Sequence, residues 1–92
     1  MKFEVTKTDN CFSGHQTYEY KLPIHGSEFI AFLGGWEVKE FHKYRRPLFT
    51  ADKGDVNIKG ILRSERIKVS FPEDSWSAKK QDFEDWLMNI LS

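Results

Sequence analysis

The chain has a single cysteine, Cys11, among its 92 residues. One thiol cannot form an internal disulfide, which excludes the disulfide scaffolds of small secreted domains and favours a reducing compartment. The sequence also lacks the succession of basic, apolar and small residues that marks a secretory signal. We therefore expect the protein to be cytoplasmic.

Long apolar runs are missing as well. The longest unbroken hydrophobic stretches are a few residues long, whereas a helix needs about 20 apolar residues to span a bilayer. We expect no membrane-spanning helix and no membrane partner. The length sets a second bound, because a chain this short has room for one hydrophobic core. Residues 1–92 are therefore predicted to form a single domain.

Motifs for catalysis, metal binding and phosphate binding are also lacking. Cys11 and His15 are four residues apart, but in a turn-rich segment, and a cysteine nucleophile needs a base and a third, orienting group. One cysteine and three scattered histidines lack the close-paired spacing of a zinc site. Gly34-Gly35 precedes an expected strand, which is the wrong order for a dinucleotide-binding loop. We expect no enzyme activity, no catalytic residue, no metal and no cofactor.

Aromatic residues, in contrast, are abundant: eight Phe, three Tyr and three Trp. A buried ring removes about 150–250 Å² from water. Rings rather than aliphatic side chains are therefore expected to dominate the core. Any ring that stays on the surface would be available to contact a partner.

Alternation of apolar and polar residues, with a period of two, predicts strands. The alternation occurs in residues 2–7, 16–22, 36–44, 56–62 and 66–71, with a further short strand possible at 48–49. Residues 51–55 are expected to form a turn, since Asp52 and Gly54 favour one. Phe41 is out of step with Trp36 and Val38, which predicts a β-bulge near Glu40. Gly60, inside a strand, indicates a bulge or a close approach of backbone.

Two helices are expected. Ser27 is a candidate N-cap for a short apolar helix that Gly34-Gly35 would end. Apolar residues recur near every 3.6 positions from Trp76 to Leu91, which predicts an amphipathic helix of about four turns. The order β-β-α-β-β-β-α indicates an α+β fold: an antiparallel sheet of four or five strands with the C-terminal helix packed on one face. The other face would be partly open, and so polar or an interface.

Positive charge is concentrated in the middle of a chain whose net charge is zero. Residues 39–68 contain nine basic and four acidic residues, and the segments on either side are acidic overall. The nine are Lys39, Lys43, Arg45, Arg46, Lys53, Lys59, Arg63, Arg66 and Lys68. Such asymmetry bears on surface potential and partners, not on the fold.

Basic residues interleaved with aromatic ones suit single-stranded nucleic acid, because cations contact phosphates while rings stack on bases. If Ile67 and Val69 face the core, then Arg66 and Lys68 face outward, and Lys59 shares that face. The sequence thus predicts a non-enzymatic binding module for nucleic acid or another anionic partner, such as an acidic protein surface. The candidate binding residues are Lys43, Tyr44, Arg45, Arg46, Lys59, Arg66 and Lys68.

Three alternatives stay open. The basic residues could be a solvated strand face whose lysines protect a sheet edge, neutralised by the acidic C-terminal helix. The chain could instead be a protein-interaction or homo-oligomerisation module anchored by exposed rings such as Trp36, Tyr44 or Trp86. Zero net charge favours this alternative over strong nucleic-acid binding, since general nucleic-acid binders are usually basic overall. A small enzyme would have to use His15, His25 or His42.

Overall fold

The structure, a computed structural model, describes residues 3–8, 15–43 and 45–91. Its elements in chain order are β1 (Glu4–Lys7), β2 (His15–Lys21), α1 (Gly26–Phe29), the 3₁₀ helix η1 (Ile30–Phe32), β3 (Glu37–Phe41), β4 (Leu48–Lys53), β5 (Val56–Ile61), β6 (Arg66–Pro72) and α2 (Trp76–Leu91). The strands form one antiparallel sheet in the order β1-β2-β6-β5-β4-β3. The predicted α+β fold with its C-terminal helix is confirmed.

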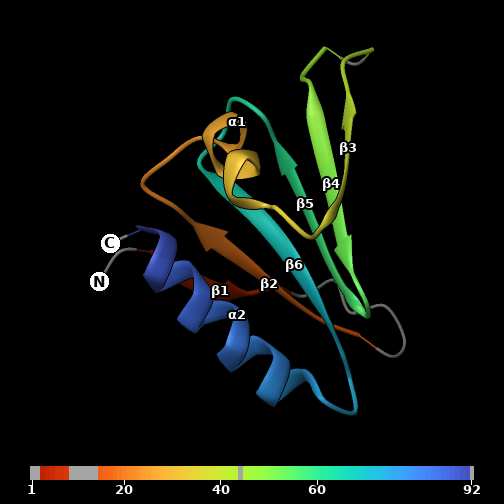
Figure 1. The fold of residues 1–92 in the computed structure, drawn as a ribbon, viewed down its shortest axis with the longest axis vertical. Helices are drawn as coiled ribbons and strands as arrows, with labels where there is room; N and C mark the ends of the chain where they lie inside the picture. Colours follow the sequence, from red (N-terminus) through yellow and green to blue (C-terminus); the bar gives the residue numbers. More distant parts are fainter. Residues whose placement is uncertain (1–2, 9–14, 44, 92) are drawn as a thin grey trace.

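Both helices lie on the same side of the sheet. Figure 1 shows α2 crossing in front of β1 and β2, whereas β3 and β4 extend away from it toward the opposite edge. The rings of Phe83 in α2 and Phe29 in α1 both pack against Trp86, at centroid distances of 5.6 and 5.8 Å. No helix in the described part of the chain is long and apolar enough to cross a membrane.

The sheet has six strands, not the four or five expected. The difference is β4, which continues to Lys53 through a segment that the sequence suggested was a turn. Phe49 and Ala51 alternate with exposed or half-buried neighbours and are fully buried, so β4 obeys the period-two rule over its whole length. The turn is confined to Gly54 and Asp55, where Gly54 takes a φ of +61°. Glycine in this first central position suits a tight hairpin turn.

The predicted bulge in β3 is wrong. β3 pairs with β4 residue by residue, from Glu37 opposite Asp52 to Phe41 opposite Leu48. Phe41 therefore belongs to the face that points away from the helices, and only Val38 and Glu40 point toward them. Phe41 breaks the alternation of β3 because it is an apolar residue on the outer face, and no bulge is needed to explain it.

The first helix begins at a different residue from the one expected. His25, not Ser27, is its N-cap, and the His25 backbone N–H donates to Glu28 Oε1 at 3.3 Å. After one turn the chain tightens into η1, and Gly35 with a φ of +90° then redirects it. Such a short helix is not stable alone. It is held in place by Phe29, whose fully buried ring lies 6.2 Å from that of Phe49.

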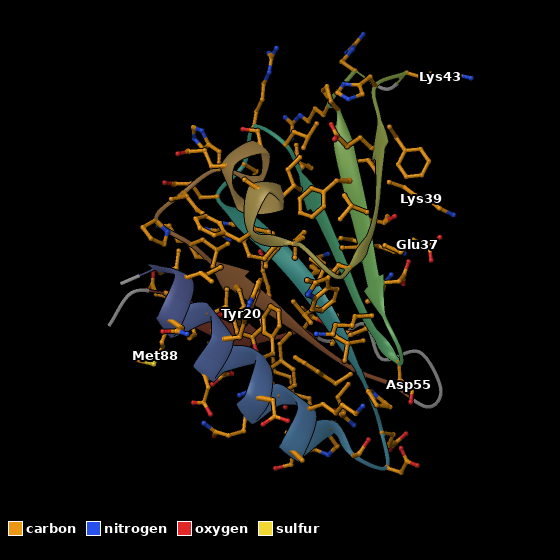
Figure 2. All side chains as sticks on the ribbon, viewed as in Figure 1. Tyr20, Glu37, Lys39, Lys43, Asp55 and Met88 are labelled. Atoms are coloured by element: carbon orange, nitrogen blue, oxygen red, sulfur yellow. The ribbon has the colours of Figure 1, made fainter. Side chains whose placement is uncertain are left out.

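Among the described residues, seven of the sixteen buried hydrophobic side chains are aromatic, so rings do not outnumber aliphatic side chains, although they are the largest of the fully buried ones. Tyr20 in β2 is fully buried beneath α2 (Figure 2), and its hydroxyl donates to Glu84 Oε2 at 2.9 Å. Burial, reinforced by the negative charge of Glu84, raises the pKa of the Tyr20 hydroxyl above its usual value, so it remains a neutral donor. Lys80 Nζ lies 2.6 Å from the same Glu84 oxygen. The helix is thereby tied to the sheet by a polar contact as well as by apolar packing.

Gly60 in β5 lies under the ring of Phe49, so its close neighbours are side chains and not the approaching backbone or the bulge that the sequence predicted. A Cβ at this position would stand 2.7 Å from Phe49 Cε1 and 2.9 Å from Ile67 Cγ2. We expect Gly60→Ala to lower the free energy of unfolding by about 1–3 kcal/mol, because overpacking displaces a buried ring. Urea denaturation measures this loss. Gly34→Ala is the matched control, since no described atom lies within 4 Å of its added Cβ; equal losses in both variants would contradict the close packing of Phe49 on Gly60.

Candidate functional site

The face of the sheet that points away from α1 and α2 is called here the open face. Residues directly opposite each other on paired strands point to the same side, so the register assigns each side chain to a face. One row of the open face crosses all six strands. Its members are Thr6, Glu19, Lys68, Lys59, Thr50 and Lys39. The sequence-based expectation that Lys59 and Lys68 share an outward face therefore agrees with the register.

Lys59 and Lys68 stand directly opposite each other on β5 and β6. Two like charges in this position destabilise a sheet unless an anion lies between them. The nearest acidic residue in the row is Glu19, which is engaged by Arg66 instead: Arg66 Nη1 donates to Glu19 Oε1 at 3.3 Å. The lysine pair is thus left with an electrostatic preference for an anion from outside the chain.

A hollow of about 330 Å³ lies on the open face beside this pair. It combines the aliphatic side chains of Leu48 and Ile61 with the basic groups of Lys59, Lys68 and Arg66. Apolar atoms beside cations suit a ligand that carries both a flat apolar part and negative charge.

A second hollow, of about 260 Å³, adjoins the first one, since Ile61 and Ser64 line both. Its basic lining comes from two separate connections in the chain. Arg45 and Arg46 lie between β3 and β4, and Arg63 lies between β5 and β6. Together with Lys59, Arg66 and Lys68, these three arginines are called here the basic surface.

The antiparallel pairing of β4 with β5 brings these two connections together. The start of β4 and the end of β5 meet at Leu48 and Ile61. Just beyond them, the Leu62 backbone N–H donates to the Pro47 carbonyl at 2.9 Å. This bond fixes the backbone on both sides of the second hollow, so the arginines extend from anchored positions.

The acidic C-terminal helix does not neutralise the basic surface by contact. α2 packs on the opposite face, where Glu84 is bound by Lys80 and Tyr20. Among the ion pairs of the described residues, one involves the basic surface, and it joins Arg66 to the carboxylate of Glu19. In the described part of the chain, the acidic residues of α2 therefore do not contact the basic surface.

Not every candidate residue joins this surface. Lys43 lies at the tip of the β3–β4 hairpin, away from both hollows (Figure 2), and Tyr44 lies outside the described residues. Lys53, on the helix side, has its Nζ 5.9 Å from the centre of the Trp36 ring. Arg45, Arg46, Lys59, Arg66 and Lys68 are brought together.

Two residues beside these candidates extend the list of binding residues, Arg63 and Phe41. Arg63 is one of the nine basic residues of the central segment. It lies in a connection between strands, so the alternation of strand residues does not predict which face of the sheet it is on. Phe41 is the second: the residue is 37 % exposed, and it lies in an apolar row with Leu48 and Ile61 on the open face. The signal was present in the sequence, as the residue that broke the alternation of β3.

The residues considered for catalysis are dispersed. His42 Nε2 lies 3.1 Å from Glu40 Oε1 at an exposed site, and His25 caps α1. The His15 backbone begins β2, and Cys11 lies outside the described residues. Within residues 3–8, 15–43 and 45–91, no three His, Cys, Asp or Glu residues gather in a way that could hold a metal ion.

Comparisons of the chain with family models, with curated proteins and with solved structures found no match.

Proposed function

We propose that this chain is a non-enzymatic binding module that holds a single-stranded nucleic acid on its basic surface. The observation that carries the proposal is the pair of adjoining hollows, one lined by three arginines and the other by two lysines and Arg66. The lysine-lined hollow opens on the face that the helices leave uncovered, and the arginine-lined hollow adjoins it where the β3–β4 and β5–β6 connections meet. This is the arrangement expected of a surface that follows a phosphate backbone.

The arginines suit the role of phosphate contacts. A guanidinium presents a planar fork of donors that matches two oxygens of one phosphate, which fixes the position of the strand as well as attracting it. Lys59 and Lys68 add point charges further along the open face. The two hollows would then hold successive phosphates of one strand.

The apolar row of Phe41, Leu48 and Ile61 suits the bases. Base faces are accessible in single strands but stacked inside a duplex, so a ring on an open sheet selects unpaired bases. Among the Phe, Tyr and Trp residues of the described strands, Phe41 is the one whose register position is on this side. Phosphate contacts should therefore outweigh stacking, and we expect binding with little dependence on base sequence.

Salt dependence tests the proposal. For a fluorescein-labelled oligothymidine of about 15 nucleotides, we expect the logarithm of the binding constant to fall linearly with the logarithm of salt concentration, as counterions leave the phosphates. Replacing Lys59 and Lys68 with Ala should flatten the slope by about 0.7 for each phosphate that the variant no longer neutralises. Fluorescence anisotropy between roughly 50 and 200 mM salt measures both quantities.

The control is a variant with Lys7 and Lys79 replaced by Ala, since both lysines are exposed on the helix side of the molecule. Its slope should equal that of the unmodified chain. A polyglutamate peptide that binds as tightly as the oligonucleotide would identify an acidic protein surface as the partner instead. An unmodified chain that binds neither probe would overturn the proposal.

A further inference from the structure

β3 is an edge strand whose outer side has no partner among the described strands. An edge strand presents a row of backbone N–H and C=O groups that can pair with another strand. Four of its five residues are exposed, and Val38 is half-buried. Figure 2 shows Glu37 and Lys39 projecting outward from this edge. We infer that β3 pairs with β3 of a second copy, so that two sheets join edge to edge.

Symmetry restricts how two identical strands can pair. An antiparallel pair related by a two-fold axis centres on one residue, which faces its own counterpart, and the flanking residues pair across the axis. The axis runs perpendicular to the sheet, so the open faces of the two copies lie on the same side. Only a few registers are then possible within the length of β3.

The register centred on Val38 is self-complementary. It sets Glu37 opposite Lys39 of the second copy, and Lys39 opposite Glu37 of the second copy, on the open face. Opposite charges directly across a strand pair stabilise it. At the centre, the two half-buried Val38 side chains meet on the helix side, where they shield each other from water. Charge complementarity thus favours a second copy of this chain as the occupant of the edge.

Every neighbouring register opposes like charges. Centring on Glu37, Lys39 or Glu40 places that residue opposite its own counterpart. Centring on Phe41 sets Lys39 opposite Lys43 of the second copy. Like charges directly opposite each other destabilise a strand pair. The charged residues of β3 therefore disfavour these other registers and favour the one centred on Val38.

The other edge of the sheet lacks this property. β1 contributes four residues, and centring its self-pairing on Val5 sets Glu4 opposite Thr6. Centring on Thr6 sets Val5 opposite Lys7, and centring on Glu4 or Lys7 opposes like charges. No register of β1 pairs opposite charges within the strand, which singles out β3.

Analytical ultracentrifugation of the full chain tests the inference. Pairing through five residues buries little area, so the dimer is expected to be weak, and the chain should be followed from about 10 µM to 1 mM. We expect reversible dimerisation. E37K replaces two attractive pairs with two repulsive ones and should raise the dissociation constant about 10-fold or more.

The double variant E37K/K39E is the decisive comparison, because it exchanges the charges and restores both attractive pairs. Its dissociation constant should return to within about 2-fold of the original, well inside the factor of about ten expected for E37K. E4K on β1 makes the same charge change at the other edge and should have no effect. A chain that stays monomeric at 1 mM, or a double variant as weak as E37K, would overturn the inference. The outcome is independent of nucleic-acid binding, which a monomer could equally show.

Discussion

Reversing the charges of Arg45, Arg46 and Arg63 together, as R45E/R46E/R63E, is expected to lower the affinity for the labelled oligonucleotide by about 1,000-fold or more. Each hydrogen bond to a charged group contributes about 1.5–3 kcal/mol, and a tenfold change in affinity corresponds to about 1.4 kcal/mol. The new carboxylates also repel the phosphates that the arginines would have bound. Anisotropy titration at fixed salt concentration measures the loss.

The fold should tolerate this variant. All three arginines lie in connections between strands and are exposed. None of them forms an ion pair with another described residue. Circular dichroism and the urea midpoint should therefore match those of the unmodified chain, which separates loss of binding from loss of structure.

The matched control is K7E/K53E/K79E, which gives the chain the same net charge but alters the helix side. If the basic surface is the site, the control should lose less than about 10-fold, because those charges lie beyond the sheet and are largely screened at physiological salt. Equal losses in the two triple variants would show that binding follows net charge alone. That result would contradict a site at the arginine-lined hollow.

Local periodicity was enough to predict most of the fold. The alternation of apolar and polar residues predicts strands with one buried face, and the apolar residues that recur at helical spacing predict α2. β4 was missed beyond its first residues because Asp52, Lys53 and Gly54 resemble a turn in isolation. In the folded chain this segment pairs with β3 on one side and β5 on the other. Tertiary pairing thus overrides the local preference of residues 52–53.

The candidate site was predictable only in part, for a related reason. The outward direction of Lys59, Arg66 and Lys68 follows from the alternation of two adjacent strands, which is local information. The meeting of Arg45 and Arg46 with Arg63 depends on β4 running antiparallel to β5, so that both connections reach one end of the sheet. Because the local sequence predicts a turn where β4 continues, it does not predict that the two connections meet at one end of the sheet.

The largest effect on stability is expected from Phe83→Ala. Phe83 is 5 % exposed, and its ring centre lies 5.2 Å from that of Tyr20 and 5.9 Å from that of Phe71. On its other side the rings of Trp36 and Trp86 lie 6.4 and 5.6 Å away. Truncation leaves a cavity where α2, two strands and the segment before β3 meet, and should cost about 3–5 kcal/mol. Thermal or urea unfolding measures it.

A loss of this size is a large fraction of the roughly 5–15 kcal/mol that stabilises an ordinary domain, so Phe83→Ala is expected to be partly unfolded near its working temperature. Phe32→Ala is the control, since Phe32 is 44 % exposed and should change stability by less than about 0.5 kcal/mol.

The variant Phe83→Leu separates the contribution of apolar volume from that of the ring contacts. It keeps apolar volume but removes the ring contacts, which add about 0.5–1.5 kcal/mol per pair beyond burial. If Phe83→Leu is as stable as the unmodified chain, volume alone holds α2 on the sheet; if it falls midway to Phe83→Ala, the cluster of rings contributes in its own right. A Phe83→Ala variant as stable as Phe32→Ala would contradict the packing of α2 on β2 and β6.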